Sequence, residues 1–137
     1  MKILICGLPG SGKSTLAEPF ANLIGGVWIN ADQVRERYDD WDFSVKGRLR
    51  QSMRMCHLAD GVVMAGKIAV ADFVCPTQLA RDWFNADYVI WMDTIKEGRF
   101  EDTNKMFEKP VDVDYHVNGW FDDTHKQLVK VVTNYMQ

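Results

Sequence analysis

The sequence predicts an α/β fold of three layers, in which a small parallel sheet is flanked by helices on both faces. Two observations lead to this fold class: apolar runs of strand length recur along the chain, and stretches with helical spacing of apolar residues separate them. The expected strands are 2–6, 27–30, 68–72 and 88–92. The expected helices are 12–24, 31–38, 46–66, 76–85, one that starts near Thr94, and 120–135.

A glycine-rich loop follows the first expected strand directly and satisfies the pattern G-x-x-x-x-G-K-[ST]. Backbone N–H groups of such a loop point inward and, with the N-terminus of the next helix, surround a polyphosphate. The side chain of Lys13 would reach the β- and γ-phosphates, and the Ser14 hydroxyl would bind Mg²⁺. The sequence therefore predicts a P-loop NTPase fold with ATP and Mg²⁺ as cofactors. The residues expected to hold ATP here are Gly7, Pro9, Gly10, Ser11, Gly12, Lys13, Ser14 and Thr15.

Polar residues follow the second expected strand, where the carboxyl end of a parallel strand places ligand-binding groups. Asn30 either caps the following helix or contacts the ligand. Asp32 and Arg35 are three residues apart and share one face of the first helical turn. Asp32 would orient Mg²⁺ or accept the proton of an attacking hydroxyl, and Arg35 would hold an anionic acceptor. The alternative is an exposed ion pair of about 0.2–0.5 kcal/mol.

Two further segments offer candidates for the site. Asp72 ends the apolar run 68–72 and would touch the metal shell, as the acidic residue that accompanies a P-loop does. In the helix 46–66, Arg48 and Gln51 would line an acceptor pocket together with Phe43. Spacing alone favours a solvated face for Arg48 and Gln51.

Length, charge and cysteine content indicate which classes of protein this chain fits. The 137 residues correspond to one domain, 1–137, and their net charge of −3 argues against a general affinity for nucleic acid. Three widely spaced cysteines indicate reduced thiols. No apolar run approaches the roughly 20 residues that span a bilayer, and the chain begins in a strand without room for a signal peptide. We expect a cytoplasmic protein with no membrane partner.

With these residues in place, the chain resembles the adenylylsulfate (APS) kinase family over most of its length. The resemblance rests on the P-loop, the segment 30–35, the segment Asp-Phe-Ser-Val-Lys-Gly-Arg at 42–48, and Phe-Val-Cys-Pro at 73–76. It implies transfer of the γ-phosphate of MgATP to the 3′-hydroxyl of adenylyl sulfate, and a possible homodimer. It also implies catalytic roles for Lys13 and Asp32. The implied acceptor-binding residues are Arg35, Phe43, Arg48, Gln51, Val74, Cys75 and Pro76.

The chain departs from that family at three places. Asn30 replaces the first aspartate of the family's D-G-D, and Gln51 replaces a shorter acceptor-binding asparagine. The segment 101–107 corresponds to the family's lid but lacks the lid arginine, and a later adenine-clamping segment has no counterpart. Arg99 and Lys105 would supply lid charge instead, Arg99 toward ATP and Lys105 toward the acceptor. The alternative for these cations is a solvated helix.

Two other functions stay open from the sequence. A polynucleotide 5′-hydroxyl kinase, or a P-loop kinase for another small molecule, would share the P-loop and the Asp-x-x-Arg pair. The acidic run 39–42 favours a small nucleotide-like acceptor over a polynucleotide, and Trp41 and Phe43 would stack on a base. A non-catalytic ATP-binding switch derived from a kinase is the other alternative. Trp28, inside a strand, is expected in the core.

Overall fold

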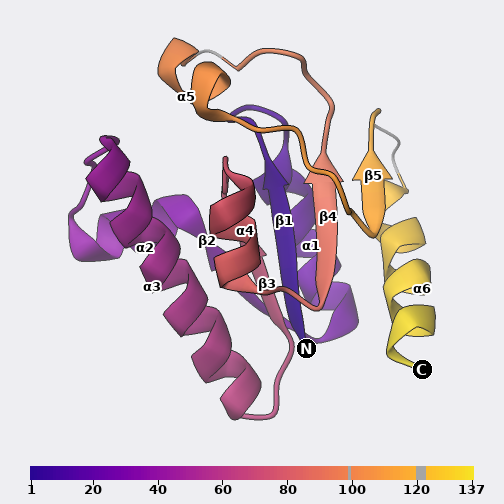
Figure 1. Cartoon of the computed structure of the whole chain (residues 1–137). Coiled ribbons are helices and arrows are strands. Elements are labelled where there is room, and N and C mark those ends of the chain that lie inside the picture. The colour runs from indigo at the N-terminus through magenta and orange to yellow at the C-terminus, as the bar shows by residue number, and fades with distance from the viewer. Residues whose placement is uncertain (99, 120–122) are drawn as a thin grey trace.

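The computed structural model describes residues 1–98, 100–119 and 123–137. Strands and helices alternate along most of this part of the chain (Figure 1). The strands are β1 (Lys2–Gly7), β2 (Val27–Asn30), β3 (Ala69–Asp72), β4 (Tyr88–Met92) and β5 (Tyr115–Val117). The helices are α1 (Lys13–Ile24), α2 (Ala31–Tyr38), α3 (Val45–Met64), α4 (Gln78–Phe84), α5 (Glu101–Met106) and α6 (Thr124–Met136).

The strands form one five-stranded sheet in the order β2-β3-β1-β4-β5, and every neighbouring pair is parallel. This confirms the predicted fold class. Because Asp72 is in register with Ile5 on one side and Asn30 on the other, the polar ends of β2 and β3 meet beside β1. The P-loop follows β1 at the same carboxyl end of the strands.

Two separate apolar cores lie on the two faces of the sheet. Alternate residues of β1 divide between them, with Ile3 and Ile5 facing α1 and α6 and Leu4 and Cys6 facing α2, α3 and α4. These β1 side chains are fully buried, as expected for a central parallel strand covered on both sides. The short helix α5 lies beyond the carboxyl ends of the strands, on the side where the P-loop emerges (Figure 1).

Three differences from the sequence-based elements were found. The expected helix from Thr94 is wrong: the Thr94 hydroxyl donates to the Ser11 carbonyl at 2.7 Å, and helix begins only at Glu101. The strand β5 was not predicted, because three residues carry too little periodicity. The expected start of the last helix at Trp120 lies outside the described residues, and α6 begins at Thr124.

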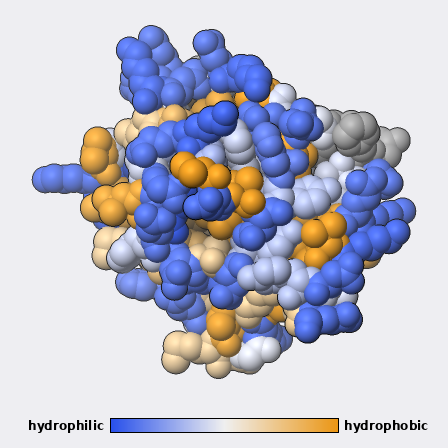
Figure 2. Space-filling view, turned by 45° about the vertical axis from the view of Figure 1, so that its right-hand side comes forward, coloured by the Kyte–Doolittle hydropathy of each residue, from blue (hydrophilic) through white to orange (hydrophobic). Residues whose placement is uncertain are grey.

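In the part of the chain that the structure describes, none of the helices is both long enough and apolar enough to cross a bilayer. On the face shown in Figure 2, hydrophobic residues form separate patches among hydrophilic ones. Scattered exposed apolar side chains of this kind are normal for a folded domain.

Candidate functional site

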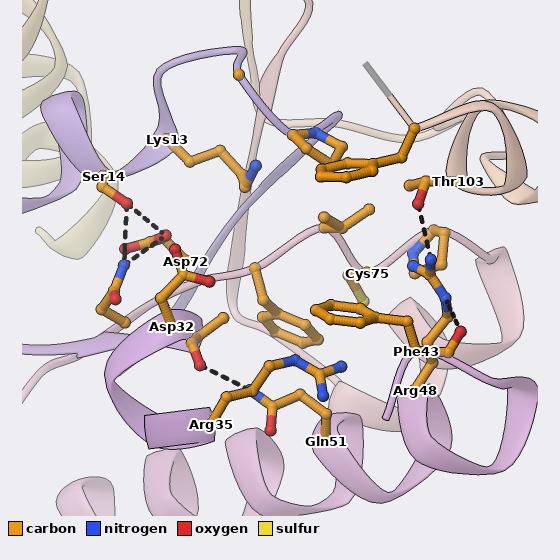
Figure 3. A pocket seen from close by; sticks show the side chains of 18 of the residues that line it. Lys13, Ser14, Asp32, Arg35, Phe43, Arg48, Gln51, Asp72, Cys75 and Thr103 are labelled. Atoms are coloured by element: carbon orange, nitrogen blue, oxygen red, sulfur yellow. Dashed lines mark hydrogen bonds between the residues drawn. The ribbon is translucent and has the colours of Figure 1, made fainter. Parts of the chain in front are cut away.

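One cavity of about 750 Å³ brings together most of the residues predicted from the sequence. It lies at the carboxyl ends of the strands, where α/β sheets bind ligands. Figure 3 shows Lys13 and Ser14 on one side of it, Phe43 and Arg48 on the other, and Asp32 between them. The predicted residues that line it are Pro9, Gly10, Gly12, Lys13, Ser14, Thr15, Asp32, Arg35, Phe43, Arg48, Gln51, Asp72, Val74, Cys75 and Pro76.

The P-loop is shaped by its glycines. Gly12 has φ 92° and Gly10 has φ 86°, left-handed values that residues with side chains rarely adopt. Gly12 is the N-cap of α1, so the free N–H groups of the first helical turn face the cavity end of the loop. Gly7 and Ser11 do not line the cavity. A Cβ on Gly7 would stand 2.6 Å from the Met92 carbonyl oxygen, so Gly7 permits the close packing of β1 against β4.

Lys13 bends back over the loop that precedes it. Its Nζ donates to the carbonyl oxygen of Leu8 at 3.0 Å. Burial lowers the pKa of the ammonium, and the nearby charge of Asp72 opposes that shift. A partly desolvated cation that carries one weak neutral partner is suited to bind an incoming phosphate.

A buried polar network joins Ser14, Asn30 and Asp72. The Ser14 hydroxyl donates to Asp72 Oδ1 at 3.3 Å and accepts from Asn30 Nδ2 at 2.9 Å. Asn30 Nδ2 also lies 3.2 Å from Asp72 Oδ2, while its Oδ1 accepts from the backbone N–H of Gln33 at 3.0 Å. Asn30 therefore caps α2, which was one of the two interpretations left open by the sequence, and it also lines the cavity. Its contact with a ligand stays a prediction.

The Trp28 indole N–H donates to Asp72 Oδ2 and completes this network. The sequence analysis placed Trp28 in the core and missed this contact, because it joins residues that are 44 positions apart. Burial raises the pKa of Asp72, and the hydrogen bonds from Trp28 and Asn30 oppose that shift.

These residues fit a Mg²⁺ ion by their chemistry. The oxygen atoms of Ser14, Asp72 and Asp32 line the same cavity and are hard ligands of the kind that Mg²⁺ prefers. Ser14 gives its proton to Asp72, so a lone pair of its oxygen remains available to a cation. Within the described ranges no group of three or more His, Cys, Asp or Glu side chains could hold a metal. Few protein ligands are typical of Mg²⁺ bound together with substrate phosphates.

Asp32 lies in the first turn of α2 and lines the cavity with an exposed side chain. Its carboxylate has no hydrogen bond or ion pair with any residue that the structure describes. The alternative interpretation, an exposed ion pair with Arg35, does not hold among these residues, because Arg35 turns away to the loop after α2. The Asp32 carboxylate is thus available to a ligand.

Arg35, Phe43 and Arg48 form the opposite wall. The Arg35 guanidinium lies 4.3 Å from the centre of the Phe43 ring, and that of Arg48 lies 5.7 Å from it. Arg48 Nη2 also donates to the Thr103 hydroxyl of α5 at 2.7 Å. Arg48 is therefore not on a solvated face, and two guanidinium groups flank one aromatic ring at the cavity.

The turn after β3, residues 73–76, also lines the cavity. Arg81 is buried, and it holds the turn by donating to the carbonyl oxygens of Cys75 at 3.0 Å and Pro76 at 3.2 Å. Burial raises the pKa of the Cys75 thiol, which therefore lines the cavity as a neutral group. Gln51 also lines the cavity, and its Nε2 donates to the Ala31 carbonyl oxygen at 2.9 Å.

Of the two predicted lid cations, only Lys105 lies in the described part of the chain. Lys105 does not line the cavity; its side chain is 74% exposed and its ammonium lies 3.4 Å from Glu101 on the same helix. Arg99 lies outside the described residues. Cavity-lining residues that the sequence analysis missed are Ala31, Ser52, Phe73, Phe100, Glu101, Asp102 and Thr103. Glu101, Asp102 and Thr103 lie in the segment 101–107 that resembles a lid, but no pattern marked these three residues, because only the fold brings α5 over the site.

Comparison with known proteins places this geometry in context. A shikimate kinase of Corynebacterium glutamicum is 24% identical over 114 residues, which are 80% of this chain and 68% of that protein. The structure of the Mycobacterium tuberculosis APS kinase CysC in complex with AMPPNP and APS is similar with a TM-score of 0.77 and 16% identity, over 96% of each chain. Shikimate kinase from Aquifex aeolicus gives a TM-score of 0.73 and 12% identity, over 99% of this chain and 98% of that one. These two structures share the fold of this chain.

The family assignment rests on a match along almost the whole chain. The profile of the AAA domain family (AAA_33) covers residues 3–137. The match includes the P-loop, the network around Asp72 and the Arg35–Phe43–Arg48 wall. The chain therefore belongs to the AAA domain family AAA_33 and has the α/β fold of the P-loop kinases.

Proposed function

We propose that the protein transfers the γ-phosphoryl group of MgATP to an alcohol, and that this alcohol is the 3′-hydroxyl of adenylyl sulfate. One observation carries the proposal: a single cavity joins the P-loop to the wall of Arg35, Phe43 and Arg48, with the Asp32 carboxylate between them. A donor and an acceptor bound at the two ends would meet at Asp32. Phosphoryl transfer requires mainly such positioning and charge stabilisation.

Each part of the cavity has a role in this reaction. Lys13 and the P-loop N–H groups hold the phosphates of ATP, with Ser14 and Asp72 on the Mg²⁺ side. Mg²⁺, when bound, neutralises charge on the phosphates. Asp32 accepts the proton of the attacking hydroxyl and aims its oxygen at the γ-phosphorus. The guanidinium groups of Arg35 and Arg48 hold the anionic part of the acceptor.

Adenylyl sulfate fits the acceptor wall chemically. Its phosphosulfate is anionic, and its adenine is a flat ring that can stack on Phe43 between the two guanidinium groups. The sequence resemblance to APS kinases and the similar fold of the M. tuberculosis enzyme support this choice. The homodimer expected from that resemblance stays a prediction.

A second acceptor class has its own support. The curated relative from C. glutamicum is a shikimate kinase. A hydroxylated carboxylate of that kind would place its carboxylate between Arg35 and Arg48 and would not need the Phe43 ring. Substitution of Phe43 therefore separates the two acceptors. Phe43→Leu should weaken the binding of adenylyl sulfate strongly and the binding of shikimate only slightly.

The test measures ADP release from MgATP with adenylyl sulfate, shikimate, a 5′-hydroxyl oligonucleotide or no acceptor. We expect stimulation by adenylyl sulfate, and loss of that stimulation in Asp32→Asn with ATP binding retained. Stimulation by shikimate alone would mean that the acceptor is different but that the class of reaction, phosphoryl transfer to an alcohol, is the same. An Asp32→Asn rate equal to that of the wild type would contradict the role of Asp32.

A further inference from the structure

Backbone carbonyls of one loop, not carboxylates, fix the cations of the acceptor wall. This loop, residues 39–44, joins α2 to α3 and is called the acceptor loop below. Arg35 Nη1 donates to the carbonyl oxygens of Asp40 at 2.9 Å and Asp42 at 3.2 Å. Arg48 Nε donates to the carbonyl oxygen of Phe43 at 2.8 Å. The orientation of both guanidinium groups therefore depends on where the acceptor loop lies.

The Asp40 side chain attaches the acceptor loop to α3. Its Oδ2 accepts from Arg50 Nε at 3.0 Å and from Arg54 Nη1 at 2.7 Å, and its Oδ1 accepts from Arg50 Nη2 at 3.2 Å. Oδ1 also accepts the backbone N–H of Asp42, within the loop, at 3.2 Å. These donors, Arg50 first and then Arg54, hold the pKa of Asp40 well below its usual range. Asp40 itself does not line the cavity.

A glycine on α3 lets the acceptor loop approach this closely. A Cβ on Gly47 would stand 2.1 Å from the Asp42 carbonyl oxygen, a distance that real Cβ atoms do not adopt. That carbonyl is one of the two that hold Arg35. Any side chain at position 47 must push the loop away from α3. Gly61, on the same helix, has nothing within 4 Å of its Cβ position.

We propose that Asp40 is a positioning residue for the phosphate acceptor: by binding Arg50 and Arg54 it fixes the acceptor loop on α3 and thereby orients Arg35 and Phe43. The acceptor wall is then formed before the acceptor arrives, which lowers the ordering cost of binding. The inference rests on the proposed function in one respect, namely that Arg35 and Phe43 contact the acceptor.

The first test compares Asp40→Asn with Asp39→Asn. Both remove one negative charge from the same loop, but the Asp39 side chain makes no hydrogen bond or ion pair with the described residues. For Asp40→Asn we expect the KM for the acceptor to rise about tenfold, while kcat and the KM for ATP stay within about twofold, because the lost interaction is uniform binding. Asp39→Asn should match the wild type. Equal acceptor KM values for the two variants would overturn the inference.

Gly47→Ala tests the same loop without touching any charge. It should raise the acceptor KM as Asp40→Asn does, whereas Gly61→Ala, a matched change on the same helix, should leave it unchanged. Because alanine favours helix over glycine at both positions, a loss of helix propensity would not explain a defect in Gly47→Ala alone. An unchanged acceptor KM in Gly47→Ala would overturn the inference.

A readout that needs no acceptor separates this inference from the proposed function. In ¹⁵N–¹H spectra, the Nη–H signals of Arg35 should be resolved in the wild type, Asp39→Asn and Gly61→Ala, because two carbonyls restrain the guanidinium. They should collapse in Asp40→Asn and Gly47→Ala. Unchanged Arg35 signals in Asp40→Asn would overturn the inference. If the wild type phosphorylates no acceptor, the proposed function fails, but a collapse confined to these two variants still supports positioning of Arg35 by Asp40.

Discussion

Replacing Asn30 by aspartate isolates the electrostatics of the site. The side-chain oxygen of Asn30 accepts the Gln33 N–H at 3.0 Å, and aspartate caps a helix equally well, so α2 keeps its cap. The Asn30 amide nitrogen lies 3.3 Å and 3.2 Å from the two carboxylate oxygens of Asp72, and both residues are buried. The variant therefore replaces a hydrogen-bond donor to Asp72 by a second carboxylate.

The magnitude follows from that distance. Two unit charges 3.2 Å apart repel by about 5 kcal/mol at an effective dielectric constant of about 20. Protonating one ordinary carboxyl group at pH 7 costs about 4 kcal/mol, which is the less costly response. Since Lys13 and local relaxation offset part of this cost, we expect Asn30→Asp to lower the free energy of unfolding at pH 7 by about 2–4 kcal/mol.

Urea unfolding between pH 4 and 8 measures the effect. In the variant, repulsion between Asp72 and the new carboxyl group at position 30 raises the folded-state pKa of this pair above its unfolded value, so the folded state binds the extra proton more tightly. The loss of stability should be full above the raised pKa and should shrink as the pH falls toward about 4. Asn30→Ser, which keeps a cap without adding charge, should show no such pH dependence. An Asn30→Asp protein as stable as the wild type at pH 7 would refute the reasoning.

Three more substitutions test contacts around the site and the core. Asp60→Asn removes the negative charge that the buried Lys2 ammonium pairs with at 2.7 Å and should cost about 1 kcal/mol at pH 7, a value reduced for the half-exposed Asp60. Because Lys2 lowers the pKa of Asp60, the wild type loses this contribution as the pH falls below about 4, and the two stability curves should converge there. Trp28→Phe removes the indole donor to Asp72 and should cost about 2 kcal/mol; an unchanged urea midpoint would contradict that contact. Arg81→Met frees the carbonyls of Cys75, Pro76 and Glu108 and should cost about 3 kcal/mol or more in thermal or urea unfolding; a loss below about 1 kcal/mol would contradict it.

Local patterns in the sequence were sufficient for most of the fold. The four predicted strands are present, and each is a run of four to six mainly apolar residues. The P-loop is recognisable because its glycines, lysine and serine serve one ligand at fixed spacing. The helix predicted from Thr94 failed because the Thr94 hydroxyl has a tertiary partner in Ser11, which no local pattern records.

The candidate site was less predictable where its parts come from distant segments. Helical spacing alone predicts a solvated face for Arg48. The fold, however, brings the Thr103 hydroxyl, 55 residues away in the sequence, to 2.7 Å from Arg48 Nη2. The Trp28 contact with Asp72 likewise depends on the pairing of β2 with β3. Lys105 was assigned by resemblance to a lid, but its side chain on α5 is exposed and does not line the cavity.

The central claim is that donor and acceptor meet in one cavity beside Asp32. The most direct measurement incubates the protein with Mg²⁺, adenylyl sulfate and ATP labelled at the γ-phosphate, and identifies the labelled product by mass spectrometry. We predict label on the 3′-oxygen of adenylyl sulfate with one ADP formed per product. Label that remains in ATP or appears only in inorganic phosphate, with adenylyl sulfate and in a parallel incubation with shikimate alike and with ATP still bound, would contradict the claim and favour a nucleotide-binding switch.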